Sequence, residues 1–435
     1  MRKGLRSCFG GVMKKSFKML AALFAVCFGL SAASCATAEQ ALSELLQAMS
    51  SVSASESCVL LPDSLSDSLS DSLSSISSEE TVSSADSGET LDSVDSSADS
   101  SVVEDIVTES LSIHFLELGN KYTGDCTLID VGDTEVLIDA GSRKGSAATI
   151  NAYLQEYCED GVLEYVIATH ADQDHIAGFV GNSGKPLRTG VLYQYSVETL
   201  IQFPLTNKSE LTASGNSSLY GEYVTAVEYA KEQGTAVYTA LQCYNNENGG
   251  ARTYTLGDGV TMQFLYQRYY EETTSDENDY SVCMLLTQGE NNYLFTGDLE
   301  TKGEASLVEN NDLPQCVLYK GGHHGSPTSS TEALLSVIQP QIVCVCCCCG
   351  SDEYTDNVAN MFPSQAFVDR VAPYTDKVYV TTIVADNDEG YESLNGNIVV
   401  WSDGSEVTVR GSNNDTLFKD TEWFKNNRLL PPSWE

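Results

Sequence analysis

From residue 111 onward, the hydrophobic and polar positions alternate between the period of a β-strand and that of an α-helix. Strands are predicted at residues 113–118, 126–131, 134–139, 165–169, 260–266, 282–287, 292–295, 316–319, 342–349, 378–382, 397–401 and 407–410. Three longer segments, 146–157, 218–234 and 330–338, have the helical period. Because strands and helices mix and hairpins lie at both ends, the order favours two sheets covered by helices over a single doubly wound sheet.

The first 35 residues have the pattern of an export signal. Six basic residues and no acidic one occur in this stretch, and residues 19–33 form an apolar run that suits a signal peptide but is short for a membrane span. Two cleavage sites compete: a lipobox-like sequence before Cys35 would give a lipoprotein, and Ala-Thr-Ala at 36–38 would release the chain at Glu39. We expect residues 1–38 to be a signal peptide and the protein to be extracellular or at the cell surface. An uncleaved membrane anchor is less favoured.

Residues 39–110 have the composition of a disordered linker. The repeat DSLSDSLSDSLSS occupies 63–75, and residues 36–110 contain sixteen acidic residues and no basic one. Such a segment has too few apolar side chains to offset its chain entropy by burial. We therefore expect an acidic, serine-rich tether followed by one folded domain at 111–435.

The net charge restricts the class of partner. The chain has 62 acidic and 23 basic residues, a formal charge of −39, and the part after residue 110 is itself acidic. An acidic surface repels phosphate backbones, so binding of duplex nucleic acid is not expected. We expect a monomer that acts on a small-molecule phosphoester or headgroup and contacts membranes only through a lipid anchor.

Four of the five histidines fall in two short clusters, each directly after an apolar strand. The clusters are His170-Ala-Asp172-Gln-Asp174-His175 and Gly-His323-His324-Gly, and Asp298 follows a third apolar strand within Thr-Gly-Asp. The fifth, His114, alternates on a predicted strand and is expected to be structural. Imidazoles and carboxylates are the usual ligands of Zn²⁺ and suit Mn²⁺, and buried carboxylates are costly unless a cation offsets them. The pattern therefore predicts a metal site built from three loops.

The first cluster resembles the competence-type variant, His-x-Asp-x-Asp-His, of the metallo-β-lactamase motif. Three more segments are similar to that superfamily: 115–141 to its opening hairpin, 278–298 to the strands before its bridging aspartate, and 318–330 to its His-His-Gly-Ser segment. The similarity covers roughly 113–410 and includes the metallo-β-lactamase-like domain of ComEC-like DNA-uptake proteins and, more distantly, phosphorylcholine esterases. It implies an α/β fold, the four-layer αββα sandwich.

The resemblance also implies two metal positions. One would be held by Asp174, His175, Asp298 and His324, and the other by His170 and Asp172 with Asp298 bridging. Many relatives add a histidine between the first cluster and the bridging aspartate, but this chain has none from Ile176 to Gly297. We expect one or two zinc ions, or manganese, with the three-ligand position the weaker.

The expected activity is hydrolysis of a phosphoester by metal-activated water. Asp174 or Asp172 would orient the water and take its proton, and His323 would protonate the leaving group or bind the transition state. A nuclease of the DNA-uptake type is one alternative. Because the additional histidine is missing, a surface-displayed, non-catalytic binding protein is another. A true β-lactamase is disfavoured, since those usually carry histidine where Asp172 stands.

The cysteines at 344 and 346–349 have two interpretations. Thiolates bind Zn²⁺ or Cu⁺ well. Free cysteine is also among the most buried residue types, and the run follows a predicted helix where a core strand is expected. Consecutive residues of a strand point to opposite faces, so the run is no disulfide framework, and the core strand is favoured.

Overall fold

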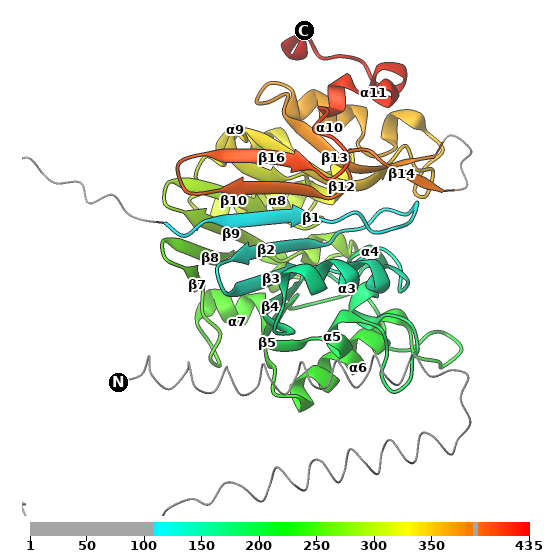
Figure 1. The fold of residues 1–435 in the computed structure, drawn as a ribbon, viewed down its shortest axis with the longest axis vertical. Helices are drawn as coiled ribbons and strands as arrows, with labels where there is room; N and C mark the ends of the chain where they lie inside the picture. The colour runs from blue at the N-terminus through cyan, green and yellow to red at the C-terminus, as the bar shows by residue number, and fades with distance from the viewer. Residues whose placement is uncertain (1–107, 386–389) are drawn as a thin grey trace, which may run out of the picture. The chain divides into compact units, whose positions relative to one another are not determined.

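The computed structural model describes residues 108–385 and 390–435. The predicted signal peptide and all but the last three residues of the predicted linker lie outside the described residues, so both stay predictions. Strand β1 begins at Leu111, where the folded domain is expected to start (Figure 1).

In the described part of the chain, sixteen strands form two eight-stranded sheets. The first sheet has the order β16 (Val407–Gly411), β15 (Ile398–Ser402), β1 (Leu111–Phe115), β2 (Thr127–Val131), β3 (Thr134–Ile138), β4 (Val162–Ala168), β5 (Ser196–Gln202) and β6 (Ala236–Thr239). The second has the order β14 (Tyr391–Ser393), β13 (Val378–Val384), β12 (Ile342–Cys349), β11 (Leu318–Lys320), β10 (Asn291–Phe295), β9 (Cys283–Gln288), β8 (Val260–Leu265) and β7 (Thr253–Gly257).

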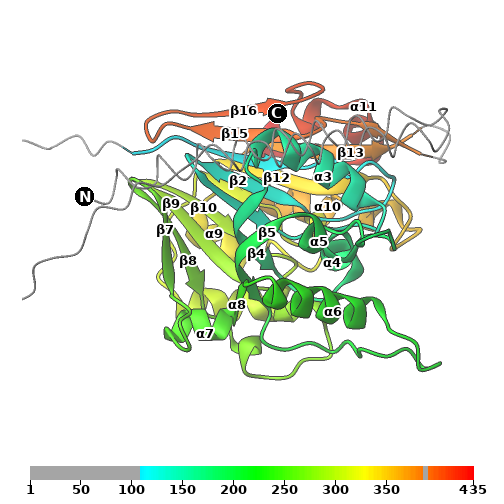
Figure 2. The ribbon, with the colours of Figure 1, turned by 60° about the horizontal axis from the view of Figure 1, so that its bottom comes forward.

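Helices cover the outer face of each sheet (Figure 2). On the first sheet lie α3 (Ser146–Tyr157), α4 (Gln173–Val180), α5 (Val191–Gln194) and α6 (Leu219–Glu232), with α7 (Ala240–Asn245) at its β6 end. On the second lie α8 (Thr301–Asn310), α9 (Glu332–Ile338) and α10 (Gln365–Val371), with α11 (Glu422–Asn427) near the carboxyl terminus. The predicted four-layer αββα sandwich is confirmed.

The sheets are wider than the sequence pattern predicts. No strand is predicted between 185 and 255, yet β5 pairs in parallel with β4, and β6 pairs with β5. Strand β5 buries Val197, Leu200 and Ile201, so its apolar residues do not alternate over the whole strand. Parallel strands buried on both faces lack the two-residue period, which explains why the pattern misses it.

Strand β12, which holds the cysteine run, is buried along its whole length. Cys344 and Cys346 belong to the core between the sheets, whereas Val345, Cys347 and Cys349 pack on the side of the helices. Burial raises the pKa of these thiols, and all cysteines in the described residues are unpaired. The core-strand interpretation is confirmed, because neutral buried thiols behave as small apolar side chains.

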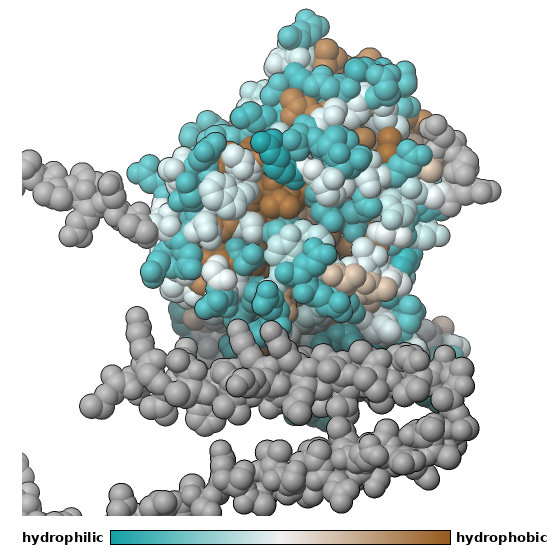
Figure 3. Space-filling model, in the orientation of Figure 1, coloured by the Kyte–Doolittle hydropathy of each residue, from teal (hydrophilic) through white to brown (hydrophobic). Residues whose placement is uncertain are grey.

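The surface of the domain is mostly polar. The face in Figure 3 is largely hydrophilic, with small separate apolar areas. The large exposed apolar side chains include Trp401 on β15 and the neighbouring pair Leu429 and Leu430. Among the described residues, no helix combines the length and the apolar content needed to cross a bilayer.

A buried ion pair joins the two sheets. Asp125 lies just before β2 in the first sheet, and Lys320 is the last residue of β11 in the second. Their side chains, 1 % and 3 % exposed, form a salt bridge. The pair lies where the strand ends of the two sheets meet, so it holds these ends in a fixed relative position.

His114 is structural, as its place on a strand predicts. Its ring nitrogens hydrogen-bond Ser112 Oγ and Tyr153 Oη, both at 2.7 Å, and its ring packs on Tyr157 with centroids 4.5 Å apart. Burial lowers the pKa of His114 to about 4. The folded protein therefore keeps this ring neutral at a pH where the unfolded chain protonates it.

We predict that His114→Gln reduces the loss of stability at mildly acidic pH. With a folded pKa of about 4 and an ordinary value of 6.5, the stabilising contribution is complete above pH 6.5 and is lost as the pH falls toward 4. At pH 5 this loss is about 2 kcal/mol. Urea denaturation at pH 7.5 and pH 5 should show a fall in unfolding free energy that is smaller in the variant by about that amount. Equal falls in both proteins would contradict the assignment.

We also predict that Lys320→Met destabilises the metal-free protein by about 3 kcal/mol, because it leaves the Asp125 charge buried without its partner. The double variant Lys320→Met/Asp125→Asn should recover much of this loss, since neither charge then remains. Denaturation in a chelating buffer gives both values. A single variant as stable as the wild type, or a double variant less stable than the single, would contradict this role for the pair.

Candidate metal centre

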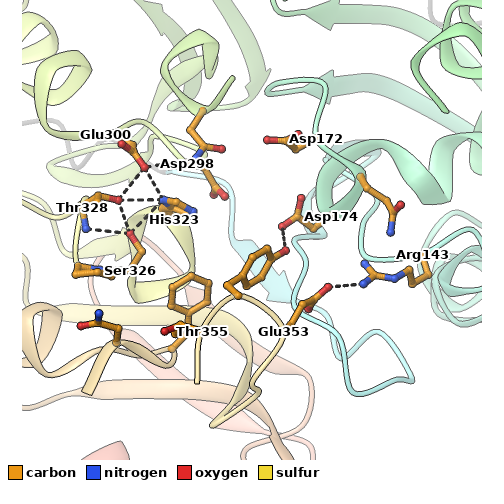
Figure 4. Close-up of a pocket in the computed structure, with 16 residues that line it drawn as sticks. Arg143, Asp172, Asp174, Asp298, Glu300, His323, Ser326, Thr328, Glu353 and Thr355 are labelled. Carbon is orange, nitrogen blue, oxygen red and sulfur yellow. Dashed lines mark hydrogen bonds and ion pairs between the residues drawn. The ribbon is translucent and has the colours of Figure 1, made fainter. Parts of the chain in front are cut away.

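The predicted site residues lie at the ends of neighbouring strands. The loop after β4 carries His170 and leads into α4, whose first turn contains Asp174 and His175. Asp298 follows β10, and His324 follows β11. In Figure 4, Asp172 and Asp174 lie on one side of a cavity, while Asp298, Glu300 and His323 lie on the other. The two sheets therefore contribute opposite walls of one site.

Three of the predicted ligands point their ligand atoms at one place. His175 Nε2 lies 3.1 Å from Asp298 Oδ2, and His324 Nε2 lies 3.0 Å from the same oxygen. Asp174 Oδ2 lies 3.5 Å from His324 Nε2 and completes the predicted set of four. These separations are within the span that one cation bridges with bonds of roughly 2 Å to each ligand.

The remaining two predicted ligands lie beside this group. His170 packs against His175 with ring centroids 4.1 Å apart, and its Nε2 lies 3.6 Å from Asp172 Oδ2. The other oxygen of Asp172 forms a salt bridge with Lys208. This half of the centre is more open, since the Asp172 side chain is 29 % exposed.

Unpaired buried atoms show that a cation fits this place. His170 Nε2, His175 Nε2, His324 Nε2 and Asp298 Oδ1 are all buried and have no hydrogen-bond partner. A buried polar atom without a partner costs about 1–3 kcal/mol. Four such atoms in one centre are accounted for if each serves as a metal ligand.

The Nδ1 atoms of His170, His175 and His324 contact other groups, and these contacts set the orientation of the three rings. Asp139 Oδ2 accepts from His175 Nδ1 at 2.8 Å, and the Cys346 carbonyl accepts from His324 Nδ1 at 2.8 Å. Thr169 Oγ1 donates to Asp139 Oδ2 at 2.7 Å and lies 3.1 Å from His170 Nδ1. With Nδ1 engaged in this way, each Nε2 is directed inward as a ligand. Asp139 therefore anchors the loops that carry His170 and His175.

Asp125 is a member of the centre that the sequence does not single out as a ligand. Ligand atoms of Asp125, His175, Asp298 and His324 all lie within 4.8 Å of one another. However, Asp125 faces the Nδ1 side of His324, at 3.2 Å, and its charge is paired with Lys320. We therefore assign Asp125 to orienting His324 and keep Asp174, on the Nε2 side, as the ligand.

The electrostatic field of the centre attracts positive charge. Burial alone would lower the pKa of His175, but the charges of Asp298 and Asp139 raise it well above its ordinary value. Burial likewise opposes ionisation of Asp298, but His175 and His324 hold its pKa well below the usual range. His170 differs, because burial and the neighbouring His175 lower its pKa to about 4. A cation is thus favoured where His175, His324 and Asp298 meet.

The close packing around these loops depends on one glycine. A Cβ on Gly141 would lie only 1.5 Å from the Asp174 carbonyl oxygen. The Gly141 N–H donates to the Asp125 backbone carbonyl at 2.8 Å, and the Asp125 N–H donates to the Asp174 backbone carbonyl at 2.9 Å. Only glycine allows this approach, which ties the start of α4 to the segment before β2.

The cavity beside the centre has a volume of about 720 Å³. Its walls include the predicted catalytic residues Asp172, Asp174 and His323. His323 Nδ1 lies 3.2 Å from Glu300 Oε1, and hydrogen bonds link Ser326 and Thr328 to the same ring (Figure 4). His323 therefore faces the cavity, but on the wall opposite Asp172.

Two features of the cavity have no counterpart in the sequence analysis. The Tyr354 hydroxyl, from the loop after β12, donates to Asp174 Oδ2 at 2.6 Å, and Glu353 beside it pairs with Arg143. Phe362 packs on His324 with ring centroids 6.0 Å apart. An aromatic wall thus stands on this side of the centre. Nothing near Tyr354 in the sequence indicates that it reaches Asp174.

Comparison with known proteins supports the predicted resemblance. Residues 119–181 match the family model described as the Metallo-beta-lactamase superfamily. The chain is 28 % identical over 226 residues to Recombination protein 2 of Haemophilus influenzae, covering 51 % of this chain and 23 % of that protein. It is 42 % identical over 86 residues to Competence protein ComA of Neisseria gonorrhoeae, covering 19 % of this chain and 12 % of that protein.

These matches span less than a quarter of each curated relative. Among solved structures, the metallo-beta-lactamase fold protein YhfI from Bacillus subtilis is 11 % identical and aligns with a TM-score of 0.35 over 68 % of this chain and all of that one. The sequence matches agree with the predicted resemblance: one segment of the chain matches the metallo-beta-lactamase superfamily model, and the chain is similar to competence-type proteins.

Proposed function

We propose that this protein is an exported metal-dependent hydrolase that cleaves a small phosphoester at the cell surface or outside the cell. The observation that carries the proposal is the convergence of His175 Nε2, His324 Nε2 and Asp298 Oδ2 beside a cavity. Proteins of this superfamily are generally metal-dependent hydrolases, which agrees with the geometry.

The residues fit a divalent ion, zinc or manganese, held by Asp174, His175, Asp298 and His324. When bound, such an ion supplies Lewis acidity, which polarises a phosphoryl oxygen and lowers the pKa of water. Asp172 and Asp174 both line the cavity and are placed to orient the attacking water and accept its proton. The Tyr354 hydroxyl donates to Oδ2 of Asp174, the oxygen that faces His324, and so limits the rotation of this carboxylate.

The leaving group would lie on the opposite wall. Because Glu300, Ser326 and Thr328 all engage Nδ1 of His323, that ring has a fixed orientation in the cavity. We propose that His323 hydrogen-bonds the leaving-group oxygen. Ser326 and Thr328 hydrogen-bond each other at 2.8 Å, which favours a role in shaping their loop over direct contact with substrate.

The charge of the walls favours a small substrate with a neutral or cationic group. Asp172, Glu300 and Glu353 all line the cavity, and the one arginine there, Arg143, is paired with Glu353. These carboxylates would repel the phosphate backbone of a nucleic-acid duplex. The names of the relatives keep a nuclease as the second candidate, because Recombination protein 2 and ComA point to DNA.

We predict that Asp298→Asn lowers the content of tightly bound metal and reduces hydrolysis of bis-p-nitrophenyl phosphate by at least roughly 100-fold, because the oxygen shared by both histidines loses its charge. Metal analysis and a chromogenic assay measure the two effects, and circular dichroism checks the fold. Asp133→Asn, in the exposed turn between β2 and β3, is the matched control and should behave as the wild type.

The same assay separates the candidate functions. Faster turnover of p-nitrophenylphosphorylcholine than of single- or double-stranded DNA supports the small-phosphoester proposal, and the reverse order supports the nuclease. A protein that loads metal but hydrolyses none of these substrates would favour the non-catalytic binding protein. A wild-type protein with no bound divalent ion would overturn the proposal.

A further inference from the structure

The loop that leaves β5 lies against the metal-binding loop that carries His170 and Asp172. Lys208 in this loop forms a salt bridge with Asp172 Oδ1, while Oδ2 of the same carboxylate faces His170 Nε2 at 3.6 Å. One oxygen of Asp172 is therefore engaged by an ammonium group and the other remains for a metal.

Glu277 fixes the position of this lysine. Glu277 is only 6 % exposed. Glu277 Oε1 accepts from the Thr206 hydroxyl at 2.7 Å and from the Ala171 N–H at 3.2 Å, and Oε2 accepts from the Asn207 N–H at 2.7 Å. The Lys208 N–H in turn donates to Thr206 Oγ1 at 3.0 Å. One buried carboxylate thus ties the lysine loop to the loop of His170 and Asp172.

The Lys208 ammonium reduces the negative charge that a second divalent ion would neutralise. Five aspartates have an oxygen within 4 Å of a histidine ring nitrogen, namely Asp125, Asp139, Asp172, Asp174 and Asp298. Two ammonium groups, of Lys208 and Lys320, pair with them. With neutral imidazoles, the net charge is three negative, so one divalent ion leaves one negative charge and two leave one positive charge. Without the Lys208 ammonium, the net charge would be four negative, which two divalent ions would neutralise. Excess charge of either sign is costly in a buried site.

We propose that Lys208 supplies the positive charge that a second metal would bring, so that the centre binds one divalent ion tightly, at Asp174, His175, Asp298 and His324. This inference rests on the metal centre of the proposed function. His170 Nε2, which faces Asp172, and Asp298 Oδ1 are buried and have no hydrogen-bond partner, so both remain available to a second ion. Removing the ammonium group should therefore open that side to a second ion.

The test measures metal binding by the whole chain. Isothermal titration with Zn²⁺ and Mn²⁺ gives the affinities, and elemental analysis after dialysis gives the number of ions retained. The wild type should retain one ion per chain. Lys208→Ala should bind a second ion at least tenfold more tightly than the wild type does, with a retained content approaching two. Adding His170→Ala to that variant should return the content to one, because it removes a ligand of the opened side.

Lys231→Ala is the matched control, since Lys231 is an exposed, salt-bridged lysine on α6 in the same part of the chain. It should leave both affinities unchanged. Two tightly held ions in the wild type, or a second-ion affinity that Lys208→Ala does not change, would overturn the inference. If the wild type fails this test but still hydrolyses phosphoesters, only the inference about Lys208 fails. If the wild type binds no ion at all, the inference and the proposed function both fail.

Discussion

The centre of this molecule depends on the compensation of buried negative charge. Asp298 is 1 % exposed and lies between His175 and His324, which are fully buried. Carboxylates at such depth are stable only when cations or hydrogen-bond donors surround them. The imidazoles, the Lys320 ammonium and the backbone N–H groups provide part of this compensation. The unpaired histidine Nε2 atoms indicate that a bound cation provides the rest.

The sandwich delivers these groups because strand ends from both sheets meet at one edge. The first sheet positions His170 and the start of α4, and the second positions Asp298, His324 and Tyr354. The Asp125–Lys320 pair crosses between the sheets at this edge. Neither sheet alone contains a full ligand set, so the metal centre exists only when the core between the sheets is packed.

The sequence singles out the residues that converge at this centre but not the groups that position them. His170, His175, Asp298 and His324 follow apolar strands and stand in recognisable clusters, which is a local signal. Asp125 and Tyr354 acquire their roles through contacts with residues far along the chain, and no local pattern encodes such contacts. Strand β5 is missed because its buried residues do not alternate along the whole strand, and the short β6 is only partly buried, so neither has the pattern that identifies β1. The leader and the linker remain predictions, because they lie outside the described residues.

Metal binding and folding should therefore be linked in this protein. A ligand that binds only the folded state stabilises it by RT ln(1 + [L]/Kd), about 4 kcal/mol at a thousandfold excess over Kd. Here the ligands come from loops of both sheets, so the unfolded chain offers no comparable site. Without the ion, the buried carboxylates of Asp174 and Asp298 repel each other, and the imidazoles of His175 and His324 offset only part of their charge. With the ion bound, the same carboxylates are attracted to the cation. Because the ligands come from both sheets, metal binding also holds the two sheets together.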